Sequence, residues 1–215
     1  MSRIVIFANG DLTESEKLRQ RLRPTDRIFC ADGGAVHALA LGLTPAAIIG
    51  DFDSLSPDLV SQLEADGVAT HRHPVRKDQT DLELAFELAI AENPDEILVV
   101  AALGGRLDQT MANIFLLTRP AYSSVRLTLV DGSQSARVLH AQQTLTVTGQ
   151  PGDTLSLVPL TPIVQRVNLT GVEWPLTGAT LTFGSTWSIS NALTTSQATI
   201  QIGEGMVLVV HLEAM

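Results

Sequence analysis

The sequence predicts an α/β fold, with an N-terminal, mostly parallel sheet covered by helices on both faces and a smaller C-terminal all-β sandwich or barrel domain. Up to about residue 132, runs that are apolar throughout alternate with segments of helical periodicity, as in a parallel sheet buried on both faces. Beyond that point helical patterns and lysine vanish, and short runs rich in Thr, Val and Leu lie between Gly and Pro turns. We therefore expect one domain over residues 1–132 and another over 133–215.

The composition is that of a globular protein and excludes several classes. The 215 residues, 45% hydrophobic and 17% charged, suffice for two small cores. A net charge of −9 without a basic run argues against a nucleic-acid partner. The apolar run 4–8 is too short for a signal peptide or a membrane span, so no membrane partner is expected. The single Cys30 fits a reducing compartment, and we expect a cytoplasmic location.

In the first domain, strands are expected wherever a short apolar run ends at turn residues. These runs are 3–8, 27–31, 48–51, 68–71, 96–102 and 125–130. The helices between them are expected at 11–22, 36–43, from Ser56, 81–91 and 108–117. Thr13 and Glu16 have the spacing of a capping box, and Pro57 suits the first turn of a helix. The helix 81–91 carries the strongest amphipathic pattern.

In the second domain, alternating runs between Gly and Pro turns predict strands. These strands are expected at 143–148, 154–159, 164–169, 179–183, 198–202 and 206–212.

Polar clusters in the first domain fall directly after predicted strands. They are Asn9-Gly10-Asp11, Asp32-Gly33-Gly34, residues 50–54 and residues 104–109. Because ligands of parallel sheets gather at the carboxyl ends of the strands, these clusters predict a binding site there.

The segment Gly50-Asp51-Phe52-Asp53-Ser54 is the centre of that site. Gly50 permits a sharp turn, and in extended backbone Asp51 and Asp53 would leave on the same side. Two carboxylates held together suit Mg²⁺, which binds a few protein carboxylates together with substrate phosphates. An acidic surface turn followed by a helix cap would carry the same pattern.

A second acidic segment, Arg76-Lys77-Asp78-Gln79-Thr80-Asp81, precedes the amphipathic helix. Thr80 or Asp78 could cap that helix, and the helix dipole favours Asp81 at its start. Two basic residues directly before the acids suit a metal–triphosphate complex, in which they neutralise phosphate charge.

The third segment, Gly104-Gly105-Arg106-Leu107-Asp108-Gln109, joins a buried strand to a helix. Its glycines let backbone N–H groups approach an anion, although it matches neither a Walker A loop nor G-x-G-x-x-G. A surface position for Arg106 and a capping role for Asp108 are the structural alternatives.

Together these segments resemble the successive motifs of thiamine pyrophosphokinases. The matching stretches are residues 31–35, 50–54, 77–81, 104–109, 171–176 and 183–191, in the order of that family. The resemblance implies a Mg²⁺-dependent transfer of the diphosphate group of ATP to the hydroxyl of thiamine, giving thiamine diphosphate and AMP. It also implies that residues 1–132 bind nucleotide and metal, that 133–215 bind thiamine, and that a homodimer forms its active sites at the subunit interface.

The same resemblance assigns roles to individual residues. Those implied to hold Mg²⁺ and orient the attacking hydroxyl are Asp51, Asp53 and Asp81. Those implied for phosphates are Arg106 and Lys77; those bordering the nucleotide or metal are Asp32, Gly33, Gly34, Asp78, Asp108 and Gln109. Those implied for thiamine are Ser188, Ser190 and Asn191, with Trp174 or Trp187 as a stacking wall. Gln109 stands where the family often has His, and Ala192 where an acidic residue is common.

Three other functions would also use acidic loops that bind a metal or a nucleotide. A pyrophosphokinase acting on another alcohol, such as a pterin, would need the same acidic loops. A nucleotide-sugar transferase would use D-x-D with a divalent metal, but has no need for the segment 78–81. A non-catalytic module would bind ATP without turnover. Thiamine is cationic, so an acidic protein suits it, and an aromatic face attracts a cation further.

Overall fold

The computed structural model describes residues 1–214 and divides the chain into two compact units, Met1–Gly132 and Ser133–Met215. The elements of the first unit are β1 (Arg3–Phe7), α1 (Ser15–Arg21), β2 (Arg27–Ala31), α2 (Gly34–Ala40), β3 (Ala47–Gly50), α3 (Pro57–Ala65), β4 (Ala69–Arg72), α4 (Asp81–Ala91), β5 (Glu96–Val100), α5 (Leu107–Leu116), the 3-10 turn η1 (Pro120–Tyr122) and β6 (Arg126–Asp131).

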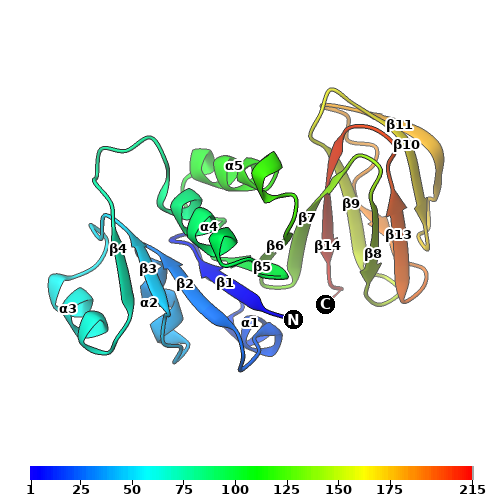
Figure 1. Cartoon of the computed structure of the whole chain (residues 1–215). Coiled ribbons are helices and arrows are strands. Elements are labelled where there is room, and N and C mark those ends of the chain that lie inside the picture. The colour runs from blue at the N-terminus through cyan, green and yellow to red at the C-terminus, as the bar shows by residue number, and fades with distance from the viewer. Residues whose placement is uncertain (215) are drawn as a thin grey trace. The chain divides into compact units, whose positions relative to one another are not determined.

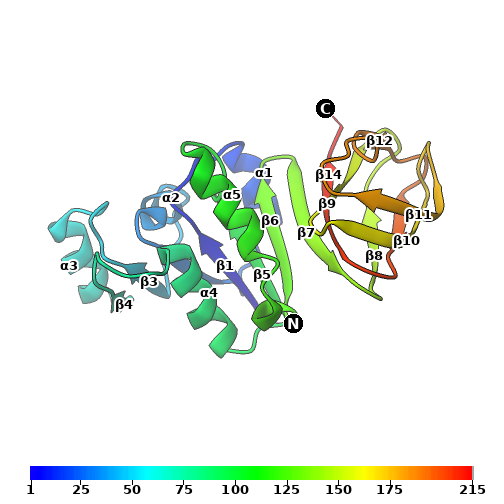
Figure 2. The same ribbon diagram turned by 90° about the horizontal axis from the view of Figure 1, so that it is seen from above.

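The first unit is a parallel sheet between two layers of helices, which confirms the predicted fold class. The strand order is β6-β5-β1-β2-β3-β4, and each neighbouring pair is parallel. Helices α4 and α5 cover one face and α1 and α2 the other (Figures 1 and 2). Since side chains alternate along a strand, Val5 and Phe7 pack in the core beneath α1–α3, while Ile4 and Ile6 face the other layer.

Two helices begin directly after a residue whose side chain caps the first turn. Ser56 accepts the backbone N–H of Leu59 at 3.2 Å ahead of Pro57, so the predicted start of α3 is confirmed. Thr80 caps α4 through the N–H of Glu83, also at 3.2 Å.

The predicted capping box of the first helix is wrong. Its helix begins only at Ser15, after Glu14 in a left-handed conformation with φ 44°. The hydroxyl of Thr13 instead donates to the carboxylate of Asp131 at 2.5 Å, at the end of β6. A long-range acceptor therefore replaces the local one.

The second unit contains two antiparallel sheets that enclose their own core. Its elements are β7 (Gln134–His140), β8 (Thr144–Thr148), β9 (Thr154–Pro159), β10 (Ile163–Thr170), β11 (Leu176–Thr182), β12 (Asn191–Ala192), β13 (Gln197–Gln201) and β14 (Met206–Leu212). One sheet has the order β12-β9-β14-β7 and the other β11-β10-β13-β8. Buried side chains from both, such as Leu157 and Val207 against Val167 and Ile200, form one cluster.

Two strands of this unit were not predicted. β7 begins with Gln-Ser-Ala-Arg and lacks a clean alternation, although it pairs with β14 over its whole length. β12 has only two residues, Asn191 and Ala192, which pair with Leu155 and Thr154 of β9. Both strands are defined by their pairing partners, and the local sequence of neither one indicates a strand.

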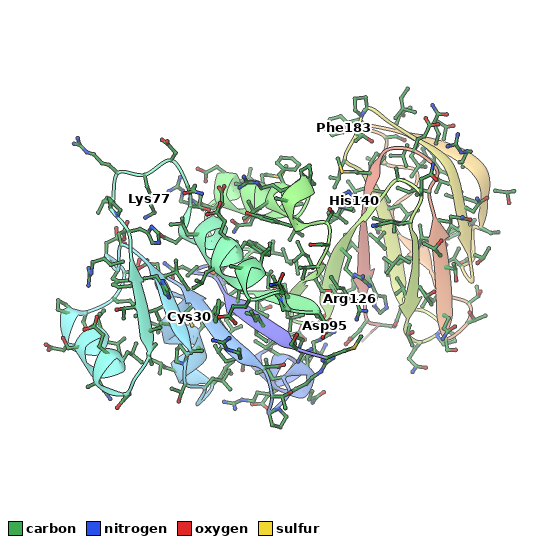
Figure 3. All side chains as sticks on the ribbon, in the orientation of Figure 1. Cys30, Lys77, Asp95, Arg126, His140 and Phe183 are labelled. Atoms are coloured by element: carbon green, nitrogen blue, oxygen red, sulfur yellow. The ribbon has the colours of Figure 1, made fainter. Side chains whose placement is uncertain are left out.

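In the described part of the chain, no helix combines the length and apolar character that crossing a membrane requires. Cys30 lies buried in the parallel sheet (Figure 3), where burial raises the pKa of its thiol. The thiol is therefore an inert part of the core.

Asp153 is the polar centre of the second unit. Its buried carboxylate accepts the N–H groups of Gln150 and Ala214, each at 2.8 Å, and contacts Nε2 of His211 at 2.8 Å. Burial alone would raise the pKa of Asp153, but the N–H donors, followed by His211, outweigh it and lower the pKa. The ionised form is thus the one that the fold stabilises.

Replacement of Asp153 by Ala should destabilise the second unit by about 2–4 kcal/mol, because the N–H groups of Gln150 and Ala214 and the ring of His211 lose their common partner. Because the pKa of Asp153 is lowered in the folded state, its ionised form stabilises the fold at pH values above the ordinary pKa of about 3.9. This contribution to the free energy of unfolding is lost as the pH falls through the folded-state pKa. Wild-type stability should therefore drop as pH falls below about 4, and Asp153→Ala should lack this component.

Both tryptophans, Trp174 and Trp187, lie in the second unit, so their fluorescence during urea unfolding measures its stability. The matched control is Asp66→Ala, an exposed carboxylate at the end of α3. Equal stability of Asp153→Ala and wild type at neutral pH would show that ionised Asp153 does not stabilise the second unit.

Candidate active site

A cavity of about 680 Å³ opens at the carboxyl edge of the parallel sheet, within the first unit. Three groups of residues line it: the loops after β1 and β2, the segment from Val75 to Leu82 with Asp51, and the loop from Ala102 into α5. The polar ones among them are Asn9, Asp11, Asp32, Asp51, Lys77, Gln79, Thr80, Asp81, Arg106, Gln109 and Asn113. The sequence clusters thus meet at one edge of the sheet.

Three carboxylates come together at this edge. Asp32 follows β2, Asp51 and Asp53 follow β3, and one oxygen of each lies within 4.8 Å of the others. Asp32 is 5% exposed, whereas Asp53 is largely exposed, so the group runs from the interior to the surface.

The backbone that presents these acids is strained. Asp32 has φ 45° and Phe52 has φ 66°, conformations that L residues, and bulky ones above all, rarely adopt. The expected extended path through Phe52 is therefore wrong. The ring of Phe52 turns into the core instead, and Arg72 holds the turn by stacking on this ring at 4.6 Å and donating to the carbonyl oxygen of Asp51 at 3.2 Å.

Gly50 brings a fourth acid to the group. Its φ is 150°, and a Cβ atom there would lie 3.1 Å both from Cβ of Asp32 and from the carboxylate of Asp81. Asp81, the first residue of α4, thus packs against the same glycine as Asp32. The absence of a side chain at Gly50 permits this approach.

Lys77 links two of the acids. Its Nζ lies 3.3 Å from Oδ2 of Asp51 and 2.9 Å from Oδ1 of Asp81, and its side chain is 14% exposed. Burial alone would lower the pKa of Lys77, but its contacts with Asp81 and Asp51 outweigh burial and raise it. The lysine is therefore charged.

The two linked acids differ in basicity. The backbone N–H of Asp53, 3.1 Å away, together with Lys77, lowers the pKa of Asp51. Burial, helped by the charges of Asp51 and Asp32, raises the pKa of Asp81 against the opposing effect of Lys77. Asp81 is the more basic of the two.

These donors fit a hard divalent cation. Oδ1 of Asp32 is buried without a hydrogen-bond partner among residues 1–214, and Oδ1 of Asp81 has its ion-pair contact with Lys77 but no hydrogen bond of good geometry. Buried carboxylate oxygens left in this way are costly, and oxygen donors are the ligands that Mg²⁺ prefers.

The opposite wall of the cavity is formed by two loops tied by backbone hydrogen bonds. Gly10 and Asp11 donate their N–H groups to the carbonyls of Ala101 and Leu103, at 2.7 and 2.8 Å. Gly104 has φ 87°, a conformation that favours glycine, and a Cβ atom there would lie 2.1 Å from the Asp11 carboxylate. The sequence places Asn9 and Asp11 in a polar cluster at this edge of the sheet but assigns neither residue an individual role, and both line the cavity.

Arg106 and Asp108 pair with each other at the entrance of α5. The guanidinium Nε donates to Asp108 at 3.1 Å, and both side chains are about two-thirds exposed. Each holds the pKa of its partner away from the ordinary value, raised for Arg106 and lowered for Asp108. Asp108 is therefore a partner of Arg106 rather than the cap of α5.

The remaining predicted residues of this unit are placed differently. Gln109 lines the cavity. Gly33 and Gly34 are buried outside its lining, where Cβ atoms would meet Asn9 and the carbonyl of Phe7, so they permit close packing of α2. Asp78 is exposed on the segment before α4 and does not line the cavity.

In the second unit, the predicted thiamine residues form one surface loop region. Trp174 and Trp187 are 58% and 56% exposed. Asn191 is buried and clamps Trp174: its Oδ1 accepts the N–H of Trp174 at 3.1 Å, and its Nδ2 donates to the carbonyl at 2.7 Å.

The two serines also bond to backbone or to neighbouring side chains. Ser188 is buried, with its hydroxyl donating to the carbonyl of Leu157 at 2.7 Å, and the N–H of Ser190 donates to Ser156 Oγ at 3.0 Å. Ser188 and Asn191 therefore hold the loop that carries the exposed indoles.

Comparisons with family models match both units. Residues 18–129 match the model "Thiamin pyrophosphokinase, catalytic domain", and residues 142–207 match "Thiamin pyrophosphokinase, vitamin B1 binding domain". A curated relative, thiamine pyrophosphokinase of Bacillus subtilis, is 30% identical over 84% of this chain and 84% of its own length.

Solved structures of thiamine pyrophosphokinases have folds similar to that of this chain. The crystal structure of thiamine pyrophosphokinase from Bacillus subtilis covers 100% of both chains with a TM-score of 0.88 at 26% identity. That of thiamin pyrophosphokinase from Geobacillus thermodenitrificans covers 99% of this chain and 98% of its own with a TM-score of 0.85 at 29% identity.

Replacing Gly50 by Ala should weaken cation binding at least about tenfold, because the new methyl group displaces Asp32 and Asp81, and should add roughly 1–3 kcal/mol of backbone strain. Calorimetric titration with Mn²⁺ measures the affinity. Gly42→Ala is the matched control, since it also has a positive φ, of 72°, but no atom lies within 4 Å of the new Cβ. Unchanged Mn²⁺ affinity in Gly50→Ala would rule out this site.

Proposed function

The chain belongs to the thiamine pyrophosphokinase family and is a diphosphotransferase, and we propose that the cavity of its first unit transfers the diphosphate group of ATP to the hydroxyl of thiamine. The observation that carries the proposal is the meeting of Asp32, Asp51, Asp53 and Asp81 with Lys77 at the carboxyl edge of the sheet. A metal–triphosphate complex needs such a mixture of acids and fixed cations.

We further propose that Asp51, Asp53 and Asp81 hold Mg²⁺, with Asp32 beside them. The support is the oxygen donor set: among residues 1–214, Oδ1 of Asp32 is buried without a hydrogen-bond partner, and Oδ1 of Asp81 has only its ion pair with Lys77. When bound, Mg²⁺ would neutralise charge that accumulates on the phosphate oxygens during transfer.

The residues of the chain position the reactants. Lys77 and Arg106 bind phosphate oxygens, and the backbone at Gly104–Gly105 admits the anion closely. Gln109 and Asp32 border the nucleotide from the cavity wall. A carboxylate of the acidic group orients the thiamine hydroxyl, whose oxygen bonds to the β-phosphorus as the bond to the departing AMP breaks. The proton that leaves the hydroxyl passes to a carboxylate oxygen of this group.

Thiamine is bound by the second unit in this proposal. An exposed indole attracts a cationic ring, so Trp174 or Trp187 forms the stacking wall. Ser188, Ser190 and Asn191 fix the loop that carries them. We also propose a homodimer with its active site at the subunit interface; exposed apolar residues, Phe183 and Ile189 in the second unit and Met111 and Phe115 on α5, support it.

The comparisons do not favour the alternatives of a pterin pyrophosphokinase, a nucleotide-sugar transferase or a non-catalytic module. A cytoplasmic site of action belongs to the same proposal. It is supported by the single, buried cysteine.

Turnover of ATP in the presence of Mg²⁺ should yield AMP and thiamine diphosphate in equal amounts, and only when thiamine is present. Asp53→Asn should lower kcat about 10²- to 10³-fold, because it removes a charged ligand of the reacting complex while leaving the exposed site folded. Chromatography of both products is the assay, and Asp58→Asn, an exposed acid on α3, is the control. AMP release without thiamine, or more than a tenth of wild-type kcat in Asp53→Asn, would contradict the proposal.

Asn191→Ala should raise KM for thiamine about five- to thirtyfold, since a loosened Trp174 loses a cation–π contact worth roughly 1–2 kcal/mol. KM for ATP should stay within twofold. Asn168→Ala is the matched control, because this half-buried Asn accepts the N–H of Gly178 at 2.9 Å in another part of the same unit. Equal changes in both KM values would disprove a role specific to thiamine.

A further inference from the structure

The ammonium group of Lys77 lies among three oxygen acceptors. Besides Asp51 Oδ2 at 3.3 Å and Asp81 Oδ1 at 2.9 Å, the carbonyl of Pro74 lies 3.3 Å away. An ammonium has three donors and no acceptor, so it can serve as the positive centre of this group. Lys77 thereby holds together two carboxylates that would otherwise repel.

Lys77 stands on a segment that is fixed at both ends and exposed between them. It joins β4 to α4 (Figures 1 and 3). At one end the N–H of His73 donates to the carbonyl of Gly50 at 2.8 Å, and at the other Thr80 caps α4. Val75 between them is 72% exposed. Neither of these two end contacts involves the ammonium of Lys77, so the ends of the strand and the helix are held independently of it.

A divalent cation on Asp51 and Asp81 would meet this ammonium as a like charge. Two positive groups a few ångströms apart in a partly buried site repel strongly, and both would draw on the same two carboxylates. The ammonium and the cation therefore compete for Asp51 and Asp81.

We propose that Lys77 is an exchangeable counter-ion: it holds Asp51 and Asp81 in position until the divalent cation displaces it, and the displaced ammonium then binds the phosphates that arrive with that cation. The inference rests on the proposed function, because it takes Asp51 and Asp81 as ligands of the cation. Cation alone must displace Lys77 into solvent, whereas a cation–triphosphate complex offers it a new anionic partner. Cation and nucleotide therefore bind cooperatively through one side chain.

The chain offers a direct test, because Lys17 and Lys77 are its only lysines. Lys17 lies on α1, paired with Glu14 at 2.8 Å, and serves as the internal reference. Acetylation of the wild-type protein with an amine-reactive reagent, followed by mass spectrometry, gives the rate at each lysine. Mn²⁺ alone should raise the rate at Lys77 at least about fivefold and leave Lys17 unchanged.

Calorimetry on the same samples separates the two possible failures. If Mn²⁺ binds and Lys77 remains as protected as before, the counter-ion inference is wrong while the proposed function stands. If Mn²⁺ does not bind with or without an ATP analogue, the metal site of the proposed function fails as well.

A variant gives the second readout. Lys77→Met removes the competing charge at nearly constant length, so the affinity for Mn²⁺ without nucleotide should rise at least about fivefold, and the gain in Mn²⁺ affinity caused by an ATP analogue should shrink. Lys17→Met should change neither quantity. Unchanged or weaker Mn²⁺ binding by folded Lys77→Met would overturn the inference, and the wild-type acetylation rates decide the matter if that variant does not fold.

Discussion

The mutual repulsion of carboxylates held at one edge of a sheet is the constraint on which the structure of the first unit depends. Asp32 and Asp51 come from neighbouring parallel strands, whose carboxyl ends must meet at the same edge. α4 then delivers Asp81 to the side of Gly50. Such an arrangement is unfavourable by itself, and positive charge must compensate it. Lys77 supplies part of that charge, and the proposed Mg²⁺ would supply the rest.

The local backbone shows how the fold maintains this arrangement. Positive φ angles at Asp32 and Phe52 cost free energy, and such outliers persist only where the surroundings fix them. The burial of the Phe52 ring, with the Arg72 guanidinium stacked on it, offsets this cost. Elsewhere in the unit, apolar strands and capped helices agree with their local preferences. Positive φ angles also occur at Glu14, Asn93 and Ala101, so backbone strain is present at the acidic edge but is not confined to it.

The sequence predicts those features whose causes are local. α4 was predicted to the residue, because its cap at Thr80 and its buried face lie within one segment. The parallel sheet and its acidic edge follow from apolar runs that end at polar turns. Features that depend on distant partners did not follow: Thr13 bonds to Asp131, β7 is defined by β14, and Phe52 turns inward because a core is available to it. Motifs likewise gave residue types near the site but not their contacts, such as the bridge from Lys77 to Asp51 and Asp81.

The central claim is that the acids at the edge of the sheet bind a divalent cation that carries the triphosphate. The most direct measurement is a crystal structure with Mn²⁺ and a non-hydrolysable ATP analogue, in which anomalous scattering locates the metal. The account predicts metal density at roughly 2.0–2.3 Å from carboxylate oxygens of the acidic group, Asp51 among them, and in contact with phosphate oxygens. Metal bound only to the phosphates, or located away from Asp51, Asp53 and Asp81, would contradict it.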